Sequence, residues 1–359
     1  MSTASKVVRP EIQAMHAYPV PDATGLVKLD VMESPYRLPP ALAEEIGQVV
    51  SKLALNRYPV PSATELRALI REVMQVPAGC DVLLGNGSDE CIQYITAALA
   101  REGAVVMAPA PSFAMFSNYA LFYRLRFVGV PLREDFTLDT EAFLATIAEE
   151  RPALIWIAFP NNPTGNAFPV ADVERILRAA PGLVVIDEAY QPFAGMTFMP
   201  RLAEFENLVV LRTVSKIGMA GLRLGYVCGR SEWIEAFNKT RSPFNINVLT
   251  EAVAIRLLQN KKVLDAQAAQ VLDERERLRP ELARLAGLTV YPSAANFLLV
   301  RVPGEKGAGI RVFEKLKAQG VLVKEFAGGH PLLENCLRLT VGTPEENRIL
   351  LAALREALK

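Results

Sequence analysis

The chain has 359 residues, of which 51% are hydrophobic and 22% charged, and its 39 basic and 39 acidic side chains give a formal net charge of zero. This length usually supports more than one hydrophobic core. The balanced charge gives no sign of a nucleic-acid-binding surface, and no apolar run is long enough to span a bilayer, so we expect neither nucleic acid nor a membrane as a partner.

Three segments follow one another along the chain. Residues 1–57 are irregular and proline-rich, with one short helix expected over about 40–55, and indicate an arm that belongs partly to a smaller domain. Residues 58–260 alternate unbroken apolar runs with helical patterns, and residues 261–359 follow an α+β pattern. Unbroken apolar runs favour strands buried on both faces. The expected fold class is α/β, with a large domain whose mostly parallel sheet is flanked by helices, plus a smaller α+β domain built from both chain ends.

The strands and helices are predicted from these runs. Predicted strands of the middle segment cover residues 81–84, 104–108, 153–159, 183–186, 208–214 and 226–228. A long helical stretch over 250–286 is expected to kink or end at Pro280. Strands are then predicted over 288–302, 321–326 and 336–341, with a helix over 308–319. The last helix begins after Thr343, which has the hydroxyl of an N-cap and is followed by a proline and two acids.

Cysteine and histidine usage indicates a cytoplasmic protein without a metal site. The four cysteines show no CxxC spacing, which favours free thiols in a reducing compartment. The stretch up to Pro21 lacks the apolar core of a signal peptide. His16 and His330 lie far apart in the sequence, so they give no indication of a shared metal.

Polar and aromatic side chains follow the predicted strands, where ligands bind in an open α/β sheet. The residues that come after successive strands are Phe113, Asn162, Asp187, Tyr190 and Lys216. Taken singly, Asp187 is explained as a turn or helix cap and Lys216 as a surface lysine. Together they match the chemistry of pyridoxal phosphate, in which a lysine forms an imine with the coenzyme and a carboxylate keeps its ring nitrogen protonated.

A glycine-rich turn and two arginines indicate anion binding. Residues 85–88 (GNGS) lead from a strand into a helix, whose first N–H groups and dipole attract phosphate, although such turns are common. Arg223 follows Lys216 and is either a phosphate ligand or a surface arginine. Arg338 shares a strand face with Thr340, away from its apolar neighbours, so it either meets an anion or lies on a solvated face.

These residues also resemble the signature of the fold-type I, class-II pyridoxal-phosphate aminotransferases. The signature segments are 160–165 (PNNPTG), 187–190 (DEAY) and 213–216 (TVSK). Within that superfamily the chain looks like the histidinol-phosphate aminotransferases, with further matches at 56–59, 87–90, 220–226 and 336–343. The resemblance covers nearly the whole chain.

The resemblance implies a role for each matching residue. Lys216 would carry the Schiff base with pyridoxal 5'-phosphate and move the proton between substrate and coenzyme. The implied coenzyme-binding residues are Ser88, Asp89, Phe113, Asn162, Asp187, Tyr190, Ser215, Lys216 and Arg223, with Tyr58 reaching the coenzyme of the other subunit. The protein would then be a homodimer with shared active sites. The implied substrate-binding residues are Tyr18, Glu33, Lys324 and Arg338.

The implied reaction exchanges an amino group between histidinol phosphate and 2-oxoglutarate, in histidine biosynthesis, by a ping-pong route. Alternatives are a transaminase of aromatic or other amino acids, a decarboxylase or lyase of a phosphorylated amino acid, and a coenzyme-binding protein without catalysis. The sequence departs from the family in three places. Lys324 stands where the family has a second arginine for the substrate phosphate, the arm has Met32-Glu33-Ser34-Pro35 instead of an asparagine-rich stretch, and the Lys216–Arg223 segment is one residue shorter.

Overall fold

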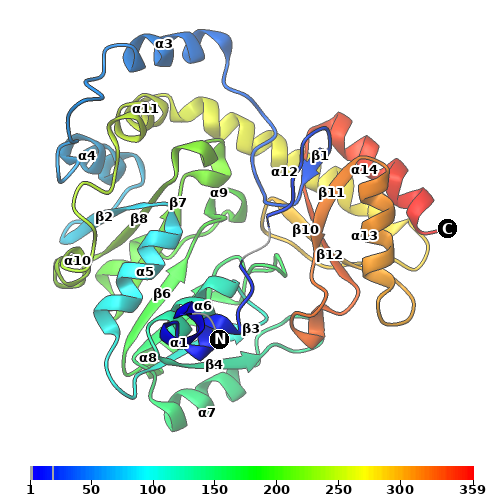
Figure 1. The fold of residues 1–359 in the computed structure, drawn as a ribbon, viewed down its shortest axis with the longest axis horizontal. Coiled ribbons are helices and arrows are strands. Elements are labelled where there is room, and N and C mark those ends of the chain that lie inside the picture. The colour runs from blue at the N-terminus through cyan, green and yellow to red at the C-terminus, as the bar shows by residue number, and fades with distance from the viewer. Residues whose placement is uncertain (1–2, 18–19) are drawn as a thin grey trace.

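The larger of two sheets forms the centre of the computed structural model, which describes residues 3–17 and 20–359 (Figure 1). Its seven strands run in the order β2-β8-β7-β6-β5-β3-β4. They are β2 (Cys80–Asn86), β3 (Val105–Ala110), β4 (Arg126–Pro131), β5 (Leu154–Ala158), β6 (Leu183–Asp187), β7 (Leu208–Thr213) and β8 (Leu224–Arg230). β8 runs in the direction opposite to the six other strands of this sheet. The expected mostly parallel sheet is therefore confirmed.

Helices cover both faces of this sheet, which explains why its strands have no polar alternation. Along β5, Ile155 and Ile157 belong to the core on one face, while Leu154 and Trp156 belong to the core on the other. The first core is completed by α4 (Thr64–Val73), α7 (Thr140–Glu150), α8 (Val170–Ala179) and α11 (Val248–Gln259). The second is completed by α5 (Ser88–Leu99), α6 (Ala114–Phe122) and α10 (Ser231–Asn238). Because both faces of the sheet are buried, side chains that bind a ligand have to lie where the strands end.

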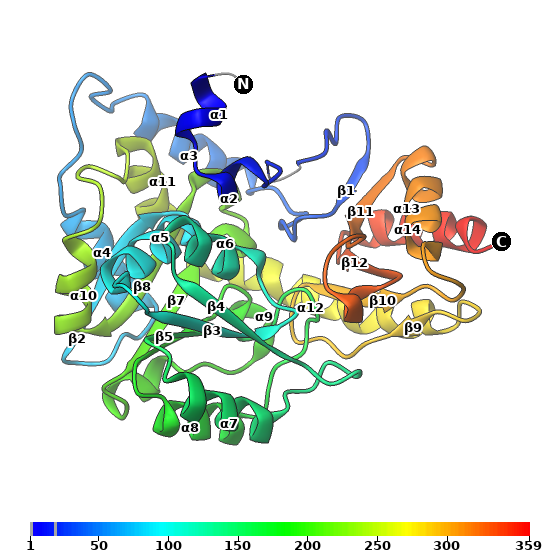
Figure 2. The same cartoon turned by 60° about the horizontal axis from the view of Figure 1, so that its bottom comes forward.

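A second sheet of five strands draws on both ends of the chain, as expected. Its order is β1 (Val27–Leu29), β11 (Val321–Glu325), β12 (Cys336–Thr340), β10 (Phe297–Arg301) and β9 (Thr289–Val290). One face packs against α13 (Ala308–Ala318), α14 (Pro344–Ala357) and the end of α12 (Lys261–Ala283), which runs from α11 to this sheet (Figure 2). The capping box of Thr343 begins α14, as the sequence indicated. The domain boundaries near residues 57 and 260 stay a prediction.

Three expected elements differ from the structure. The stretch 250–286 is two helices divided at Asn260, whose Nδ2 donates to the Arg256 carbonyl oxygen at 2.9 Å. Pro280 lies inside α12, and burial of Leu278 and Leu282 holds the last turn in place. Residues 288–302 form two strands, β9 and β10, with a proline-containing loop between them. The arm helix, α3 (Pro40–Val50), is shorter than expected.

The remaining elements are short. They are α1 (Thr3–Val7), α2 (Pro10–Gln13), α9 (Gln191–Ala194) and 3-10 turns at Met199–Ala203, Ser215–Ile217, Ala220–Leu222 and Pro331–Leu333. All four cysteines are free and buried. Within residues 3–17 and 20–359, no helix has the length and apolar character needed to cross a membrane. The same residues contain no group of three or more His, Cys, Asp or Glu side chains arranged to hold a metal ion.

Candidate active site

A cavity of about 870 Å³ lies between the ends of the large-sheet strands and the small sheet. Its walls come from the arm, from the loops after β3, β5 and β7, and from β11 and β12. Six residues that the sequence singled out line it together: Asp89, Phe113, Asn162, Lys216, Lys324 and Arg338. These residues are far apart in the chain, and the strand order brings them to one place.

Lys216 lies in the turn that follows β7, and its amine faces the arm. Its Nζ donates to the carbonyl oxygen of Val31 at 3.0 Å. Burial and the positive charge of Arg338 lower the pKa of Lys216 from 10.5 to about 8, although Glu33 acts in the opposite direction. A substantial share of the amine is therefore neutral slightly above neutral pH, which is the nucleophilic form.

Asp187 is the last residue of β6 and is only 5% exposed. Its Oδ1 accepts a hydrogen bond from the backbone N–H of Ala189 at 3.0 Å. Burial raises the pKa of Asp187 from 3.8 to about 7, against the lowering effects of this bond and of Lys216. A buried carboxylate of this kind gains from a cationic hydrogen-bond donor, so a protonated pyridine nitrogen fits here.

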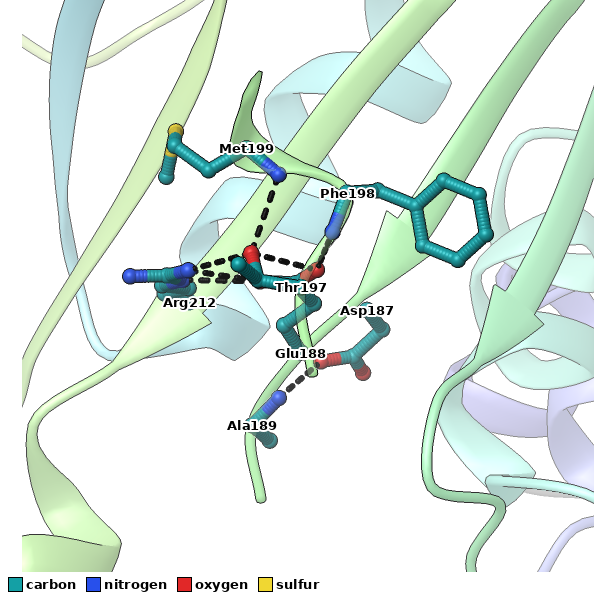
Figure 3. A network of polar contacts seen from close by, with 7 residues as sticks. All are labelled: Asp187, Glu188, Ala189, Thr197, Phe198, Met199 and Arg212. Carbon is teal, nitrogen blue, oxygen red and sulfur yellow. Dashed lines mark hydrogen bonds and ion pairs between the residues drawn. The ribbon is translucent and has the colours of Figure 1, made fainter. Parts of the chain in front are cut away.

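A buried ion pair fixes the chain directly beside Asp187 (Figure 3). The carboxylate of Glu188 accepts from Nε of Arg212 at 2.9 Å, from the hydroxyl of Thr197 at 2.8 Å and from the N–H of Phe198 at 2.5 Å. Because the pair is enclosed and its oxygens are hydrogen-bonded, removing either charge would leave the other buried and uncompensated. The network therefore ties the end of β6 to β7 and holds Asp187 at the sheet edge.

The start of α5 and Arg223 form a cradle for an anion. Gly87, at φ +82°, turns the chain from β2 into α5, and a Cβ added there would lie 2.5 Å from Nη2 of Arg223. Ser88 is the first residue of α5, and Asp89 pairs with Arg223 at 3.3 Å. Ser215 is buried after β7. Free N–H groups at a helix start beside an arginine fit a phosphate.

Asn162 and Phe113 line the cavity together with Lys216, and Tyr190 lies three residues after Asp187 in the chain. Oδ1 of Asn162 accepts from Nη1 of Arg338 at 2.5 Å, which leaves the amide group of Asn162 to donate. Tyr190 is buried and packs edge-on against Phe297, with ring centroids 5.2 Å apart. The ring of Phe113 lines the cavity. A flat aromatic coenzyme would find both a stacking surface and polar partners here.

Two cations meet on the small sheet. Lys324 and Arg338 are directly opposite in the β11–β12 ladder, and both line the cavity. Leu337 and Leu339 belong to the core on the other face, as the alternation predicted. Burial, followed by the charge of Arg338, lowers the pKa of Lys324. Two adjacent, partly desolvated cations favour binding of an anion.

Seven predicted residues that the structure describes do not line this cavity: Ser88, Asp187, Tyr190, Ser215, Arg223, Tyr58 and Glu33. Tyr58 is 81% exposed and stacks on Phe244, with centroids 4.8 Å apart. Glu33 forms an ion pair with Lys28 within the arm. Tyr18 lies outside the described residues.

Val31 and Met32 of the arm also line the cavity, although no motif in the sequence marks them as binding residues. Val31 contributes a backbone carbonyl, which leaves no trace in residue type.

Known proteins resemble this chain in sequence over its whole length. The profile of the family described as aminotransferase class I and II matches residues 24–354. A histidinol-phosphate aminotransferase of Cupriavidus pinatubonensis is 56% identical over 363 residues, covering 100% of this chain and 98% of that protein. One of Burkholderia pseudomallei is 55% identical over 359 residues, covering 100% of both chains.

A solved structure has the same fold. The histidinol-phosphate aminotransferase of Sinorhizobium meliloti, in complex with pyridoxal 5'-phosphate, superposes with a TM-score of 0.87 at 26% identity, covering 99% of this chain and 98% of that one. The family profile and the relatives that share more than half of the sequence lead to one conclusion: the chain belongs to the class I and II aminotransferases.

Proposed function

We propose that this aminotransferase, with pyridoxal 5'-phosphate as coenzyme, exchanges the amino group between histidinol phosphate and 2-oxoglutarate by a ping-pong route. The names of its full-length relatives support the substrate. The observation that carries the proposal is the pair of cations, Arg338 and Lys324, side by side on one wall of the cavity that Lys216 also lines. A phosphorylated substrate needs positive charge in the same cavity as the reacting amine.

The residues around Lys216 suit this coenzyme. Pyridoxal phosphate, when bound, supplies an electron sink for bonds at the amino-bearing carbon. Asp187 would contact the ring nitrogen and hold its proton, because burial raises the pKa of this carboxyl and a cationic partner would offset the cost of its charged form. Nζ of Lys216 would take the proton from the substrate carbon and deliver it to the coenzyme.

The other predicted residues would orient the coenzyme. The amide of Asn162 and the hydroxyl of Tyr190 would donate to the 3-oxygen of the ring, and Phe113 would stack on its face. The phosphate of the coenzyme would be bound by the cradle residues Ser88, Asp89, Ser215 and Arg223. On the substrate side, Arg338 would hold a carboxylate of glutamate or 2-oxoglutarate and Lys324 the phosphate of histidinol phosphate, with Glu33 and Tyr18 contributing from the arm.

Replacing Lys324 by alanine tests the substrate. A charge-assisted contact to a charged ligand contributes about 1.5–3 kcal/mol, so Lys324→Ala should lower kcat/KM for histidinol phosphate about ten- to a hundredfold. Phenylalanine carries no phosphate, and its kcat/KM should change much less. Steady-state kinetics with both amines and with threonine phosphate, using 2-oxoglutarate as acceptor, measures this. Histidinol phosphate should also be the best of the three donors for the unaltered enzyme.

The control is Lys317→Ala, which removes an exposed lysine from α13 of the same small domain. It should leave kcat/KM for each donor unchanged. Equal losses on histidinol phosphate and phenylalanine in Lys324→Ala would contradict the phosphate role, and a preference for phenylalanine in the unaltered enzyme would favour an aromatic amino-acid transaminase.

An exposed apolar patch supports a homodimer with shared sites. The patch consists of Leu55, Tyr58, Val60 and Phe244, which are 68%, 81%, 60% and 38% exposed. Tyr58 stacks on Phe244, and large exposed apolar side chains that lie together mark interaction surfaces. A second copy of the chain on this patch would carry Tyr58 to the coenzyme phosphate of its partner, which would explain its position outside the cavity of its own chain.

Mixing two inactive variants tests this arrangement. In a heterodimer of Tyr58→Ala and Lys216→Ala, one site combines an intact Lys216 with an intact Tyr58 from the other subunit. After equal mixing and random exchange, half of the dimers are mixed, and activity should recover to about a quarter of the unaltered level. Mass spectrometry of differently labelled subunits verifies exchange. Exchange without recovered activity would show that Tyr58 does not act across the interface.

A further inference from the structure

Three successive residues of the arm, Asp30 to Met32, form hydrogen bonds through their backbone atoms with side chains from distant parts of the chain. The carbonyl oxygen of Asp30 accepts from Nη2 of Arg338 at 2.8 Å, and that of Val31 accepts from Lys216. Arg338 and Lys216, which both line the cavity, are thus both held by arm carbonyls. The conformation of the arm therefore sets where these cations lie.

Met32 has a conformation that its residue type does not favour. Its φ is +56°, in the left-handed region that is costly for a residue with a side chain, and it is only 6% exposed. Such conformations persist where surrounding contacts enforce them, and they occur often at functional sites. This left-handed residue comes directly after the two carbonyls that accept from Arg338 and Lys216.

Two buried polar side chains of the small sheet enforce this conformation. The hydroxyl of Thr340 accepts from the N–H of Met32 at 3.1 Å, and Nδ2 of Asn296 donates to the Met32 carbonyl at 3.0 Å. Thr340 and Asn296 are 3% and 1% exposed, so neither has water as a substitute partner. Thr340 also shares the strand face of Arg338, two residues earlier in β12, so one strand supplies both the cation and the lock.

We infer that Thr340 and Asn296 are positioning residues of the transaminase, which lock Met32 so that the arm holds Arg338 in place to receive the substrate carboxylate. The inference rests on the proposed function for its kinetic consequence only. Without the lock, the Asp30 carbonyl would no longer be fixed against the guanidinium, and Arg338 would lose one of the acceptors that orient it. Substrate binding would weaken, while Lys216 and Asp187 would keep their chemistry.

Thr340→Val removes the hydroxyl at nearly constant volume, and Thr340→Ser keeps it. In Thr340→Val, deuterium exchange of the Met32 amide should become at least about tenfold faster, which corresponds to about 1.4 kcal/mol of lost protection. The KM for glutamate should rise about tenfold with kcat changed by less than about threefold, as expected when a substrate-orienting contact is lost. Thr340→Ser should restore both values. Exchange is read by mass spectrometry of peptides covering residues 27–34.

The matched control is Thr96→Val, which removes a buried hydroxyl that donates to the Ile92 carbonyl inside α5. It should leave the Met32 amide as protected as before. If Thr340→Val does not fold, Asn296→Ala removes the other half of the lock and should produce the same two changes.

Two results would overturn the inference: unchanged exchange at Met32 in Thr340→Val, or faster exchange with an unchanged KM for glutamate. A different result would show that the proposed substrate is wrong. An unaltered enzyme that turns over glutamate but not histidinol phosphate would remove the substrate and leave the positioning role to be decided by the two measurements above.

Discussion

Lys216→Ala should abolish transamination and leave the fold intact. The amine is the group that would hold the coenzyme covalently and move the proton at the substrate carbon, and loss of a positioned acid–base group alone costs about 10²–10⁴-fold in rate. Nζ donates a hydrogen bond to the Val31 carbonyl, and the loss of this contact takes away little that stabilises the protein. Turnover should fall by at least about 10³-fold, with the circular dichroism spectrum and the melting temperature of the apoenzyme nearly unchanged.

Sodium borohydride provides the decisive control. Reduction of the unaltered holoenzyme should fix the coenzyme covalently to the chain, and peptide mapping should locate it at Lys216. The alanine variant should still bind pyridoxal phosphate through the cradle around Arg223 but release it on denaturation after borohydride treatment. A reducible protein–coenzyme adduct that survives in Lys216→Ala would show that another lysine carries the coenzyme.

The central strands were predictable because of where they lie. β5, β6 and β7 are buried on both faces, so each begins with an unbroken apolar run of four or five residues. β4 lies at the edge of the sheet and includes exposed Arg126, Gly129 and Pro131, which hide the strand from a search for apolar runs. β1 has three residues and exists because it pairs with β11, a contact between opposite ends of the chain. Pairing between distant segments leaves no local pattern in the sequence.

The site was predictable where function is expressed in side chains at strand ends. Asp187 and Lys216 follow apolar runs, and the parallel order of the strands brings them to one edge. The arm could not be read in this way, because Asp30, Val31 and Met32 act through backbone atoms. Met32 offers no glycine to mark its left-handed conformation, which arises from Thr340 and Asn296, some three hundred residues later.

Asp187→Asn should reduce turnover by orders of magnitude while the coenzyme remains bound. An amide cannot balance a positive charge on the ring nitrogen, so the ring would lose its proton and with it most of its capacity to accept electrons. The backbone N–H of Ala189 would still find an oxygen acceptor in asparagine, so the local structure should persist. Single-turnover kinetics with glutamate measures the chemical step, and coenzyme content is read from absorbance. Near-normal turnover would show that another group protonates the ring.

The same substitution should stabilise the apoenzyme, in a pH range set by Asp187. Its pKa in the folded protein is about 7, above the ordinary 3.8, so the folded state binds this proton more tightly than the unfolded state. Ionisation of Asp187 therefore opposes folding increasingly as the pH rises from about 4 to about 7, and fully above that. Asparagine carries no such charge, so the apoenzyme of Asp187→Asn should match the unaltered one near pH 4 and melt at a higher temperature at pH 8.

The control is Asp273→Asn, which alters an exposed carboxylate on α12 and should show no such divergence. Bound coenzyme should narrow the difference at pH 8, because its ring nitrogen gives the buried carboxylate the cationic partner that the apoenzyme lacks. Equal melting temperatures of the two apoenzymes at every pH would mean that Asp187 is ionised in the folded protein at no cost, and would remove the reason for expecting it to hold a proton on the ring.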